Sequence, residues 1–489
     1  MPTSASPAAG QDLQTLLAVA RKYLQQKNLL EAAKSYFLVT RLHPDCLEAY
    51  CQLAVVLSES NFLPEASACI QRAIQLKPKQ PKLRLFQGSI LKRLGRFDEA
   101  ADCCRQEIQI DPTDADAHYN LGLVLQNLDR SEEAITAFQT ALHLRPGYVD
   151  ALLNLGLVQR QSGKTDDAIR CFQEAVRREP QNPEAHWEFG TTLLSLGEFK
   201  TGWPEYEWRW QLKNFTTPAA RFSQPRWDGS ELHGQRILLH CEQGYGDIIQ
   251  FARYATLVAR RGGEVILGCP PALSSLLKTV PGVSETATTP GGLEFDVHAP
   301  LMSLPAIFAT TVANIPATGP YLTAPPGPPA GVLPAAPGFK VGIVWAGDPA
   351  NKNDRRRSVT LEHFLPLVKM PGIICYSLQV GARTADLNHP EFAGRIVELG
   401  GGFHDFADTA RAVAELDLII TVDTALAHLA GALGKPVWLL LPYEAEWRWM
   451  LEREDSPWYP TMRLFRQSAP GDWKGLFERL LLALPTRAG

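Results

Sequence analysis

The sequence predicts an α-helical solenoid followed by an α/β region of two facing lobes, each built on a parallel sheet. A proline recurs every 34 residues through the first half of the chain, and small residues recur at the same spacing. In the second half, short apolar runs of strand length alternate with helical segments. Repeated helical units give a solenoid, whereas alternating strands and helices give parallel sheets covered by helices.

The regular prolines mark the ends of paired antiparallel helices. Proline cannot continue a helix, so it separates one unit from the next. Small residues at fixed helical positions allow the two helices of a unit to approach closely. The recurrent positions are Pro44, Pro78, Pro112, Pro146 and Pro180, together with Ala32, Ala66, Ala100, Ala134 and Ala168.

This pattern resembles the tetratricopeptide repeat (TPR). The clearest unit reads "PTDADAHYNLGLVLQNLDRSEEAITAFQTALHLR" at residues 112–145, and six units span residues 10–213. The resemblance implies a solenoid whose concave surface binds a peptide or a protein segment. The repeats alone indicate a protein partner and do not indicate a catalytic activity.

The sixth unit departs from the pattern. Gly202 replaces the small alanine, and "GWPEYEWRW" (202–210) places a proline and tryptophans where a regular second helix belongs. A repeat that ends a solenoid must bury its face against something other than another repeat. We therefore expect the tryptophans to dock on the next domain, with a simple terminal cap as the alternative.

The second half divides into two Rossmann-like lobes. We assign residues 214–325 to the first lobe, residues 326–338 to a linker rich in proline and glycine, and residues 339–489 to the second lobe. Ligands of such sheets bind beyond the carboxyl ends of the strands, where the strand order reverses. The two lobes can therefore hold a ligand between them.

The stretch "TVDTALAHLAGALGK" (421–435) joins a buried strand to a helix of small residues. Asp423 or Thr424 can cap this helix by accepting its free N–H groups. An open first turn instead offers N–H donors and a partial positive charge to an anion. His428, one turn further, can point the same way and donate a proton to a phosphate. A diphosphate site and a capped, buried helix are the two interpretations.

The same stretch resembles the nucleotide-sugar motif of bacterial heptosyltransferases, and the similarity to their lobes covers about residues 235–485. Repeats followed by two such lobes also resemble the O-GlcNAc transferases and their bacterial relatives. Both resemblances imply a GT-B glycosyltransferase. In such an enzyme the first Rossmann-like lobe would bind the acceptor of the sugar, and the second would bind the nucleotide-sugar donor. The resemblances favour the diphosphate site, with Asp423, Thr424 and His428 as binding residues.

"CEQGYGD" (241–247) follows the first strand of the first lobe. Gly244 and Gly246 permit a tight turn and a close approach of ligand to backbone, so we expect them to bind the nucleotide sugar. Asp247 then begins a helix that faces the other lobe. An inverting transfer needs a base for the acceptor hydroxyl, and the resemblance to heptosyltransferases gives Asp247 this role. The alternative is that Asp247 only caps its helix.

"WAGDPANKNDRRRS" (345–358) follows the first strand of the second lobe. Both resembled families place a lysine where Arg357 stands, so we expect Arg357 to bind the diphosphate; a solvated basic loop is the alternative. Gln379, at the end of another strand, is expected to contact the base or ribose of the donor. "YEAEWRWM" (443–450) is expected to be a packed return segment rather than a catalytic one.

Composition and missing motifs narrow the function. A net charge of −4 argues against general affinity for nucleic acids. No apolar run is long enough to span a membrane, and the start of the chain lacks a secretion signal. Nine cysteines without framework spacing are expected to be reduced thiols in a cytoplasmic protein. Without an Asp-x-Asp beside a second-half strand, we expect no metal site and no cofactor besides the nucleotide-diphosphate sugar as co-substrate.

The leading hypothesis is a metal-independent, inverting glycosyltransferase whose solenoid selects a protein acceptor. A heptosyltransferase-like enzyme that acts on glycans or lipopolysaccharide is the first alternative. A TPR scaffold whose lobes have lost activity is the second. The sequence does not identify the base or the sugar of the donor.

Overall fold

The computed structural model describes residues 12–213, 215, 222–242, 244–289, 292–328, 338–351 and 354–484. The chain forms two compact units, Met1–Ala185 and His186–Gly489. The sixth repeat, which the sequence pattern assigns to the solenoid, therefore belongs to the same compact unit as the sheets. Residues 329–337 of the expected linker lie outside the described part of the chain.

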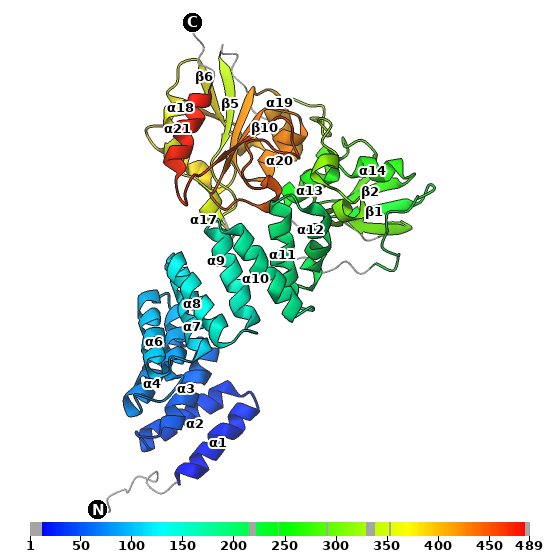
Figure 1. Cartoon of the computed structure of the whole chain (residues 1–489). Helices are drawn as coiled ribbons and strands as arrows, with labels where there is room; N and C mark the ends of the chain where they lie inside the picture. Colours follow the sequence, from blue (N-terminus) through cyan, green and yellow to red (C-terminus); the bar gives the residue numbers. More distant parts are fainter. Residues whose placement is uncertain are drawn as a thin grey trace, which may run out of the picture. The chain divides into compact units, whose positions relative to one another are not determined.

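The first unit consists of successive antiparallel helix pairs (Figure 1). The second helix of each pair ends two residues before one of the regular prolines, as the sequence predicts. The helices are α1 (Leu13–Gln25), α2 (Leu29–Leu42), α3 (Leu47–Glu59), α4 (Leu63–Leu76), α5 (Leu83–Arg93), α6 (Phe97–Ile110), α7 (Ala115–Asn127), α8 (Ser131–Leu144), α9 (Val149–Gln161) and α10 (Thr165–Arg178).

Small residues set the spacing of the helices within a repeat. The five recurrent alanines, Ala32 to Ala168, have no exposed surface. A Cβ atom added at Gly122 would lie 2.6 Å from the ring of Phe138, and one at Gly156 would lie 2.5 Å from Phe172. No side chain fits at these distances, so the close approach that the 34-residue pattern predicts is present in the structure.

The sixth repeat is irregular and packs on the sheet region. Helix α11 (Pro183–Ser195) is regular, but α12 (Phe199–Tyr206) is short and contains Pro204, and a 3₁₀ helix, η1 (Glu207–Gln211), follows it. Trp203 is 2% exposed, and its Nε1 donates a hydrogen bond to the Thr310 carbonyl at 2.9 Å. Its ring also meets that of Trp447 edge to face. The expected docking through a tryptophan is therefore confirmed for Trp203.

The first sheet has four parallel strands in the order β3-β2-β1-β4. The order reverses between β1 and β4, because β2 and β3 extend from one side of β1 while the chain returns to its other side. The strands are β1 (Arg236–His240), β2 (Glu264–Gly268), β3 (Val283–Ala287) and β4 (Val297–Pro300). The helices include α13 (Tyr245–Ala252), α14 (Ala255–Arg260), α15 (Pro271–Leu277) and α16 (Leu304–Ile307).

The second sheet has six parallel strands in the order β10-β9-β8-β5-β6-β7, which reverses between β5 and β8. This is the doubly wound arrangement of a dinucleotide-binding fold. The strands are β5 (Phe339–Val344), β6 (Ile373–Ser377), β7 (Ile396–Glu398), β8 (Leu418–Val422), β9 (Val437–Leu441) and β10 (Met462–Arg466). The helices include α17 (Asp354–Arg357), α18 (Leu365–Val368), α19 (Phe406–Ala414), α20 (Ala425–Ala432) and α21 (Trp473–Ala483).

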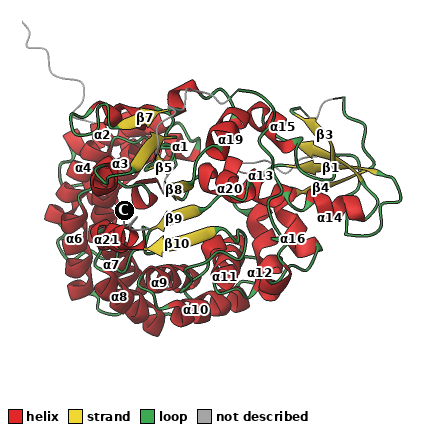
Figure 2. Cartoon of the chain, turned by 90° about the horizontal axis from the view of Figure 1, so that it is seen from above, coloured by secondary structure: helices red, strands yellow, loops and turns green. Residues whose placement is uncertain are grey.

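Helices α13 and α20 bring the two sheets together. They lie side by side between the two groups of strands (Figure 2). In the chain, α13 follows β1 and α20 follows β8, and each of these strands lies next to the reversal of its sheet. The α/β character of the second half is thus as predicted. Among the helices of the described part, none combines the length and the apolar character that a bilayer crossing requires.

The packing of Trp203 leads to a test of the two-unit organisation. Trp203→Ala should lower the free energy of unfolding of the sheet-containing unit by about 3–5 kcal/mol, because it leaves a cavity and an unpaired Thr310 carbonyl. Urea unfolding should show an earlier transition for this unit and an unchanged transition for the first five repeats. Leu482→Ala, at a side chain that is 87% exposed, should change neither transition. A single transition that shifts as a whole would contradict this organisation.

Candidate functional site

The carboxyl ends of β5 and β8 form the first part of the site. We call residues 345–347 and 423–425 the β5–β8 edge, since they follow these two neighbouring strands at the point where the strand order reverses. Ligands of doubly wound sheets bind at such a reversal. Of the residues predicted to bind the donor, Asp423 and Thr424 belong to this edge, and Gln379 and Arg357 contact it.

Gln379 shapes the backbone of this edge. Its Oε1 accepts hydrogen bonds from the backbone N–H groups of Trp345 at 3.2 Å and Ala346 at 3.0 Å. Its Nε2 donates to the Ala346 carbonyl at 3.0 Å, and the residue is 3% exposed. The amide is thus already occupied by the protein. The structure places Gln379 as a brace for the loop after β5, whereas its predicted contact with a base or ribose stays untested.

Arg357 lies against the same loop. A Cβ atom at Gly347 would lie 2.7 Å from Nη2 of Arg357, so the glycine makes room for the guanidinium. The Arg357 Nε lies 3.5 Å from Oδ1 of Asp354, and 23% of the side chain is exposed. Its charge also opposes the rise in the pKa of Asp423. Arg357 thus packs on Gly347 at the β5–β8 edge, to which Asp423 also belongs.

The first turn of α20 is not closed by its N-cap side chain. Thr424 is the N-cap residue, with extended backbone angles, but its hydroxyl makes no capping hydrogen bond; it lies 3.3 Å from the Thr421 hydroxyl. Oδ2 of Asp423 accepts from Nε1 of Trp449 at 2.9 Å. The interpretation of Thr424 as a side-chain cap is therefore wrong. Thr424 and Ala425 are partly exposed, so the start of the helix reaches solvent.

His428 is buried and contacts Tyr459, Trp449 and Gly246. Nδ1 of the ring lies 2.9 Å from the Tyr459 hydroxyl, and the ring stacks on Trp449. A Cβ atom at Gly246 would lie 2.8 Å from the His428 Cδ2. Burial, together with Arg448 and Arg253, lowers the pKa of His428 well below its ordinary value, so the ring is neutral at pH 7. In this structure His428 packs helix α20 against α13, and its predicted contact with a phosphate stays untested.

The start of α13 is the second part of the site. Gly244 is the N-cap residue of this helix, and the Asp247 carboxylate, in the first turn, accepts a hydrogen bond from its backbone N–H. Oδ1 of Asp247 also accepts from Nη2 of Arg448 at 2.5 Å. Burial raises the pKa of Asp247, and the Arg448 charge opposes that rise. Gly246 provides the close contact with His428 described above.

Arg448 is a residue of this site that the sequence analysis missed. Besides Asp247, its guanidinium donates to the Gln250 side chain at 2.9 Å and to Glu446 at 3.2 Å, and the residue is 8% exposed. It also opposes the rise in the pKa of Asp423. The signal in the sequence was an arginine between two tryptophans in "YEAEWRWM", which we assigned to packing. Arg448 does pack, but its charge also acts on two carboxylates: Asp247 on α13 and Asp423 just before α20.

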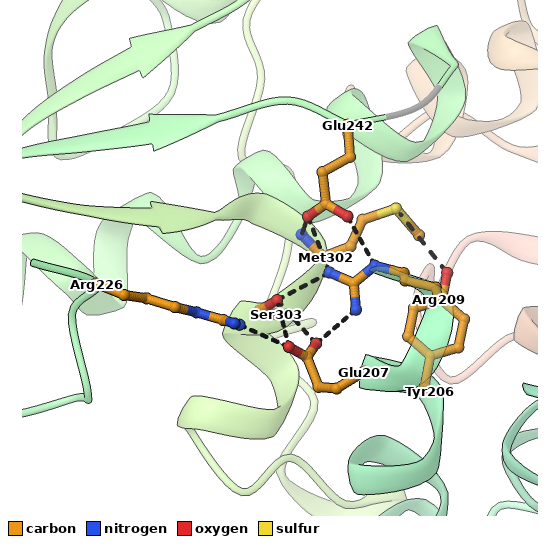
Figure 3. A network of polar contacts seen from close by, with 7 residues as sticks. All are labelled: Tyr206, Glu207, Arg209, Arg226, Glu242, Met302 and Ser303. Atoms are coloured by element: carbon orange, nitrogen blue, oxygen red, sulfur yellow. Dashed lines mark hydrogen bonds and ion pairs between the residues drawn. The ribbon is translucent and has the colours of Figure 1, made fainter. Parts of the chain in front are cut away.

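The corresponding reversal in the first sheet is filled by the protein itself. Figure 3 shows Arg209, from the sixth repeat, between the segments that follow β1 and β4. Its Nε donates to Oε2 of Glu242 at 2.7 Å, and its Nη2 donates to Oε1 of Glu242 at 3.0 Å and to the Ser303 hydroxyl at 2.8 Å. Neither the Arg209 nor the Glu242 side chain has exposed surface. An ion pair thus occupies the position where such a sheet would bind a ligand.

A second carboxylate completes this network. Nη1 of Arg209 donates to Oε1 of Glu207 at 2.6 Å, and the Ser303 hydroxyl donates to the same oxygen at 2.8 Å. Arg226 reaches the other oxygen of Glu207 at 2.6 Å (Figure 3). Every nitrogen of the Arg209 guanidinium therefore has a partner. A buried ion pair is tolerated only when its groups are satisfied in this way, and removal of one partner costs ~3–5 kcal/mol.

The described residues offer no obvious place for a metal ion. Within the described ranges, no three side chains of His, Cys, Asp or Glu gather as metal ligands. The absence of a metal from the mechanism stays a prediction. Among the described residues, positive charge near the β5–β8 edge comes from Arg357, from Arg448 and from the partial charge at the start of α20.

Comparisons with known proteins establish the repeats. A family model described as "Tetratricopeptide repeat" matches residues 113–179, and one described as "TPR repeat" matches residues 88–129. Protein FlbA of Caulobacter vibrioides is 28% identical over 321 residues, which cover 60% of this chain and 54% of FlbA. The chain thus spans about half the length of this curated relative. The first half carries tetratricopeptide repeats, as the 34-residue period predicts.

Solved structures with similarity to the chain cover about a third of it. MamA from Desulfovibrio magneticus RS-1 is 20% identical with a TM-score of 0.34, covering 35% of this chain and 97% of MamA. YrrB, described as "a TPR protein with an unusual peptide-binding site", is 20% identical with a TM-score of 0.32, covering 36% of this chain and 90% of YrrB. PilF of Pseudomonas aeruginosa is 17% identical with a TM-score of 0.36, covering 42% and 91%.

The buried Asp423 predicts a dependence of stability on pH. Burial raises the pKa of Asp423 to about 6, although Arg448 opposes the rise. Between its ordinary pKa near 4 and about 6, the folded protein then binds more protons than the unfolded chain, so wild-type stability falls as pH rises. Asp423→Asn does not titrate and keeps an oxygen for Trp449. From pH 4 to pH 7, the free energy of unfolding of the wild type should fall by ~3 kcal/mol relative to this variant.

Urea unfolding at four pH values in this range measures the difference. Asp455→Asn is the control, because 70% of its side chain is exposed and Arg453 holds its pKa below the ordinary value. The free energy of unfolding of the wild type relative to Asp455→Asn should not fall over this pH range. A constant difference between wild type and Asp423→Asn across this pH range would show that Asp423 is ionised throughout.

Proposed function

We propose that the chain transfers a sugar from a nucleotide-diphosphate donor to an acceptor, and that the repeats select a protein as that acceptor. One observation carries the donor site: the partly exposed start of α20, after β8, and the Arg357 guanidinium, against Gly347 after β5, both lie at the reversal of the second sheet. At the reversal of the first sheet, the described residues Arg209 and Glu242 instead form a buried ion pair. The donor therefore belongs to the second lobe.

The β5–β8 edge has the chemistry that a diphosphate requires. The first N–H groups of α20 point out of the helix, and the helix dipole adds a partial positive charge there. The Arg357 guanidinium can bind two phosphate oxygens at once, a geometry that a lysine lacks. Both groups would stabilise the charge that develops on the diphosphate as it leaves. They replace the metal ion on which other glycosyltransferases depend.

Asp247 is the proposed base. In the transfer, the acceptor hydroxyl oxygen forms a bond to the anomeric carbon as the bond from that carbon to the diphosphate breaks. The hydroxyl proton passes to the Asp247 carboxylate, and the nucleoside diphosphate leaves with the electron pair. A single displacement of this kind inverts the configuration of the sugar. Burial raises the pKa of Asp247, which makes it a better proton acceptor, and Arg448 fixes the position of its Oδ1.

A scaffold without activity is the second candidate. The neutral, buried His428 and the filled reversal of the first sheet both favour it, because each removes a group or a space that a transferase would use. Under this proposal the repeats bind a protein segment and the sheets serve only as a platform. A thermal-shift screen with UDP, GDP, ADP and CMP separates the two, since a scaffold binds none of them.

Consecutive arginines provide a matched test of the donor site. Arg357→Ala should weaken the binding of the nucleoside diphosphate identified in the screen by about 10- to 100-fold, as expected for the loss of a charge-assisted contact. Arg356→Ala should change the affinity by less than about threefold, because 64% of this side chain is exposed and screened by solvent. Calorimetry measures both values. Equal effects of the two substitutions would place the diphosphate elsewhere.

Asp247→Asn tests the base. The amide keeps an oxygen for Arg448 but cannot accept the proton, so turnover should fall by ~10²–10⁴ while donor affinity stays within a few-fold. Turnover is measured as nucleoside diphosphate released in the presence of acceptor, and circular dichroism shows that the fold is retained. Asp228→Asn, on an exposed turn, should have normal turnover. Normal turnover of Asp247→Asn would assign the proton to another group.

A further inference from the structure

An exposed tyrosine stands between the two glycines of "CEQGYGD" (241–247). Tyr245 is the first residue of α13 and is 44% exposed, whereas Ile248 and Ile249 of the same helix are buried. Helical side chains tilt toward the helix N-terminus, so the Tyr245 ring projects past the start of α13. Single exposed tyrosines are ordinary, and it is the surroundings of this one that give it a function.

The starts of α13 and α20 touch each other. A Cβ atom at Gly246 would lie 3.6 Å from Cα of Ala425, which belongs to the β5–β8 edge, and 2.8 Å from Cδ2 of His428. At this point the two helices leave no room for a ligand between them. A ligand that rests on the start of α20 therefore borders the start of α13, where Tyr245 is the first side chain.

Phe406, the first residue of α19, supports the Tyr245 ring. The two ring centroids lie 5.1 Å apart, with the ring planes at 57° to each other. Phe406 is partly buried and packs against the larger apolar core of this unit. Oδ1 of Asp405 accepts from the backbone N–H groups of Ala407 and Asp408, both at 2.9 Å. The first turn of α19 is therefore capped, unlike that of α20, and its contribution is an aromatic ring that fixes Tyr245.

The proposed reaction decides which part of the donor meets this ring. Asp247, two residues after Tyr245, has to reach the hydroxyl that attacks the anomeric carbon, so that carbon must come to the first turn of α13. The transferred sugar is joined directly to the diphosphate, whereas the ribose separates the nucleobase from it. With the diphosphate on the start of α20, the transferred sugar is the nearer of the two ends.

An aromatic face suits such a sugar. A hexopyranose carries its hydroxyl groups around the rim and C–H groups on its two faces. The face of an aromatic ring is electron-rich, so it attracts C–H groups and excludes water from them. Tyr245 offers an exposed ring that Phe406 holds in place, which lowers the entropy lost when a ligand packs on it.

We propose that Tyr245, supported by Phe406, packs against the ring of the transferred sugar and that this sugar is a hexopyranose. The inference rests on the proposed function and adds to it a contact between the first lobe and the donor. A nucleoside diphosphate without its sugar does not reach Tyr245. The ring therefore distinguishes the donor from the product that leaves after transfer.

Three substitutions in the full chain test this contact. Tyr245→Ala removes the ring, and since alanine favours a helix, circular dichroism should show a retained fold. Tyr245→Phe keeps the ring. Phe62→Ala, at a residue that is 57% exposed on the second repeat, is the control. Calorimetry compares the nucleoside diphosphate identified in the thermal-shift screen with its sugar-bearing form, which is UDP-glucose, ADP-glucose or GDP-mannose.

The expected result is a loss confined to the sugar-bearing ligand. Tyr245→Ala should weaken its binding by about 3- to 10-fold, the scale of an aromatic ring contact, and that of the nucleoside diphosphate by less than about twofold. Tyr245→Phe should retain most of the additional affinity that the sugar provides. Phe62→Ala should bind both ligands as the wild type does, because its side chain belongs to the other compact unit.

The remaining outcomes contradict the inference in different ways. Equal weakening of both ligands by Tyr245→Ala would overturn it, because a contact with the nucleobase or a purely structural role affects the two ligands alike. Unchanged affinity for both would also overturn it. In these two cases the wild type still binds the nucleoside diphosphate, so the proposed donor site stands. A wild type that binds none of the nucleotides would overturn the proposed function and this inference together.

Discussion

The buried ion pair between Arg209 and Glu242 connects the repeats to the sheets. Neither side chain has exposed surface, so the attraction is little screened, and the groups that complete it are fixed in place. Glu242 belongs to the segment that leads from β1 into α13. The sixth repeat therefore holds the segment on which the orientation of α13 depends, and with it the position of Asp247. From there, Gly246 meets His428 and Asp247 meets Arg448, which ties α13 to α20.

The two sheets differ in what lies at the point where their strand order reverses. At the first, a guanidinium from the preceding repeat satisfies a carboxylate, a hydroxyl and a second carboxylate, so the polar groups that face the reversal bind one another. At the second, Gln379 braces the loop after β5, and Thr424 and Ala425 at the start of α20 are partly exposed. Under the proposed function, this difference assigns the donor to the second sheet.

Much of the fold was accessible from the sequence because its signals are local. The 34-residue period fixes the helix pairs, and the apolar runs at 236–240 and 418–422 mark buried parallel strands. The strand order was not accessible, since parallel strands joined by helices carry no signal for their neighbours. Within the candidate site, Asp423 and Thr424 were predicted from their place after a strand and Arg357 from a resemblance, and their binding roles stay predictions. Arg448 was missed because its partner Asp247 is 201 residues away, and His428 faces the protein because the small Gly246 lets α13 cover it.

The boundary between the compact units falls inside the last repeat pair, since α11 begins before it and α12 lies beyond it. The first five repeats and the sixth therefore differ in how freely they can change during evolution. Insertion or loss of whole 34-residue units before Ala185 alters the length of the binding surface and leaves Arg209 in its buried position. A change in the sixth repeat would instead disturb the buried pair of Arg209 and Glu242, and with it the segment that leads into α13.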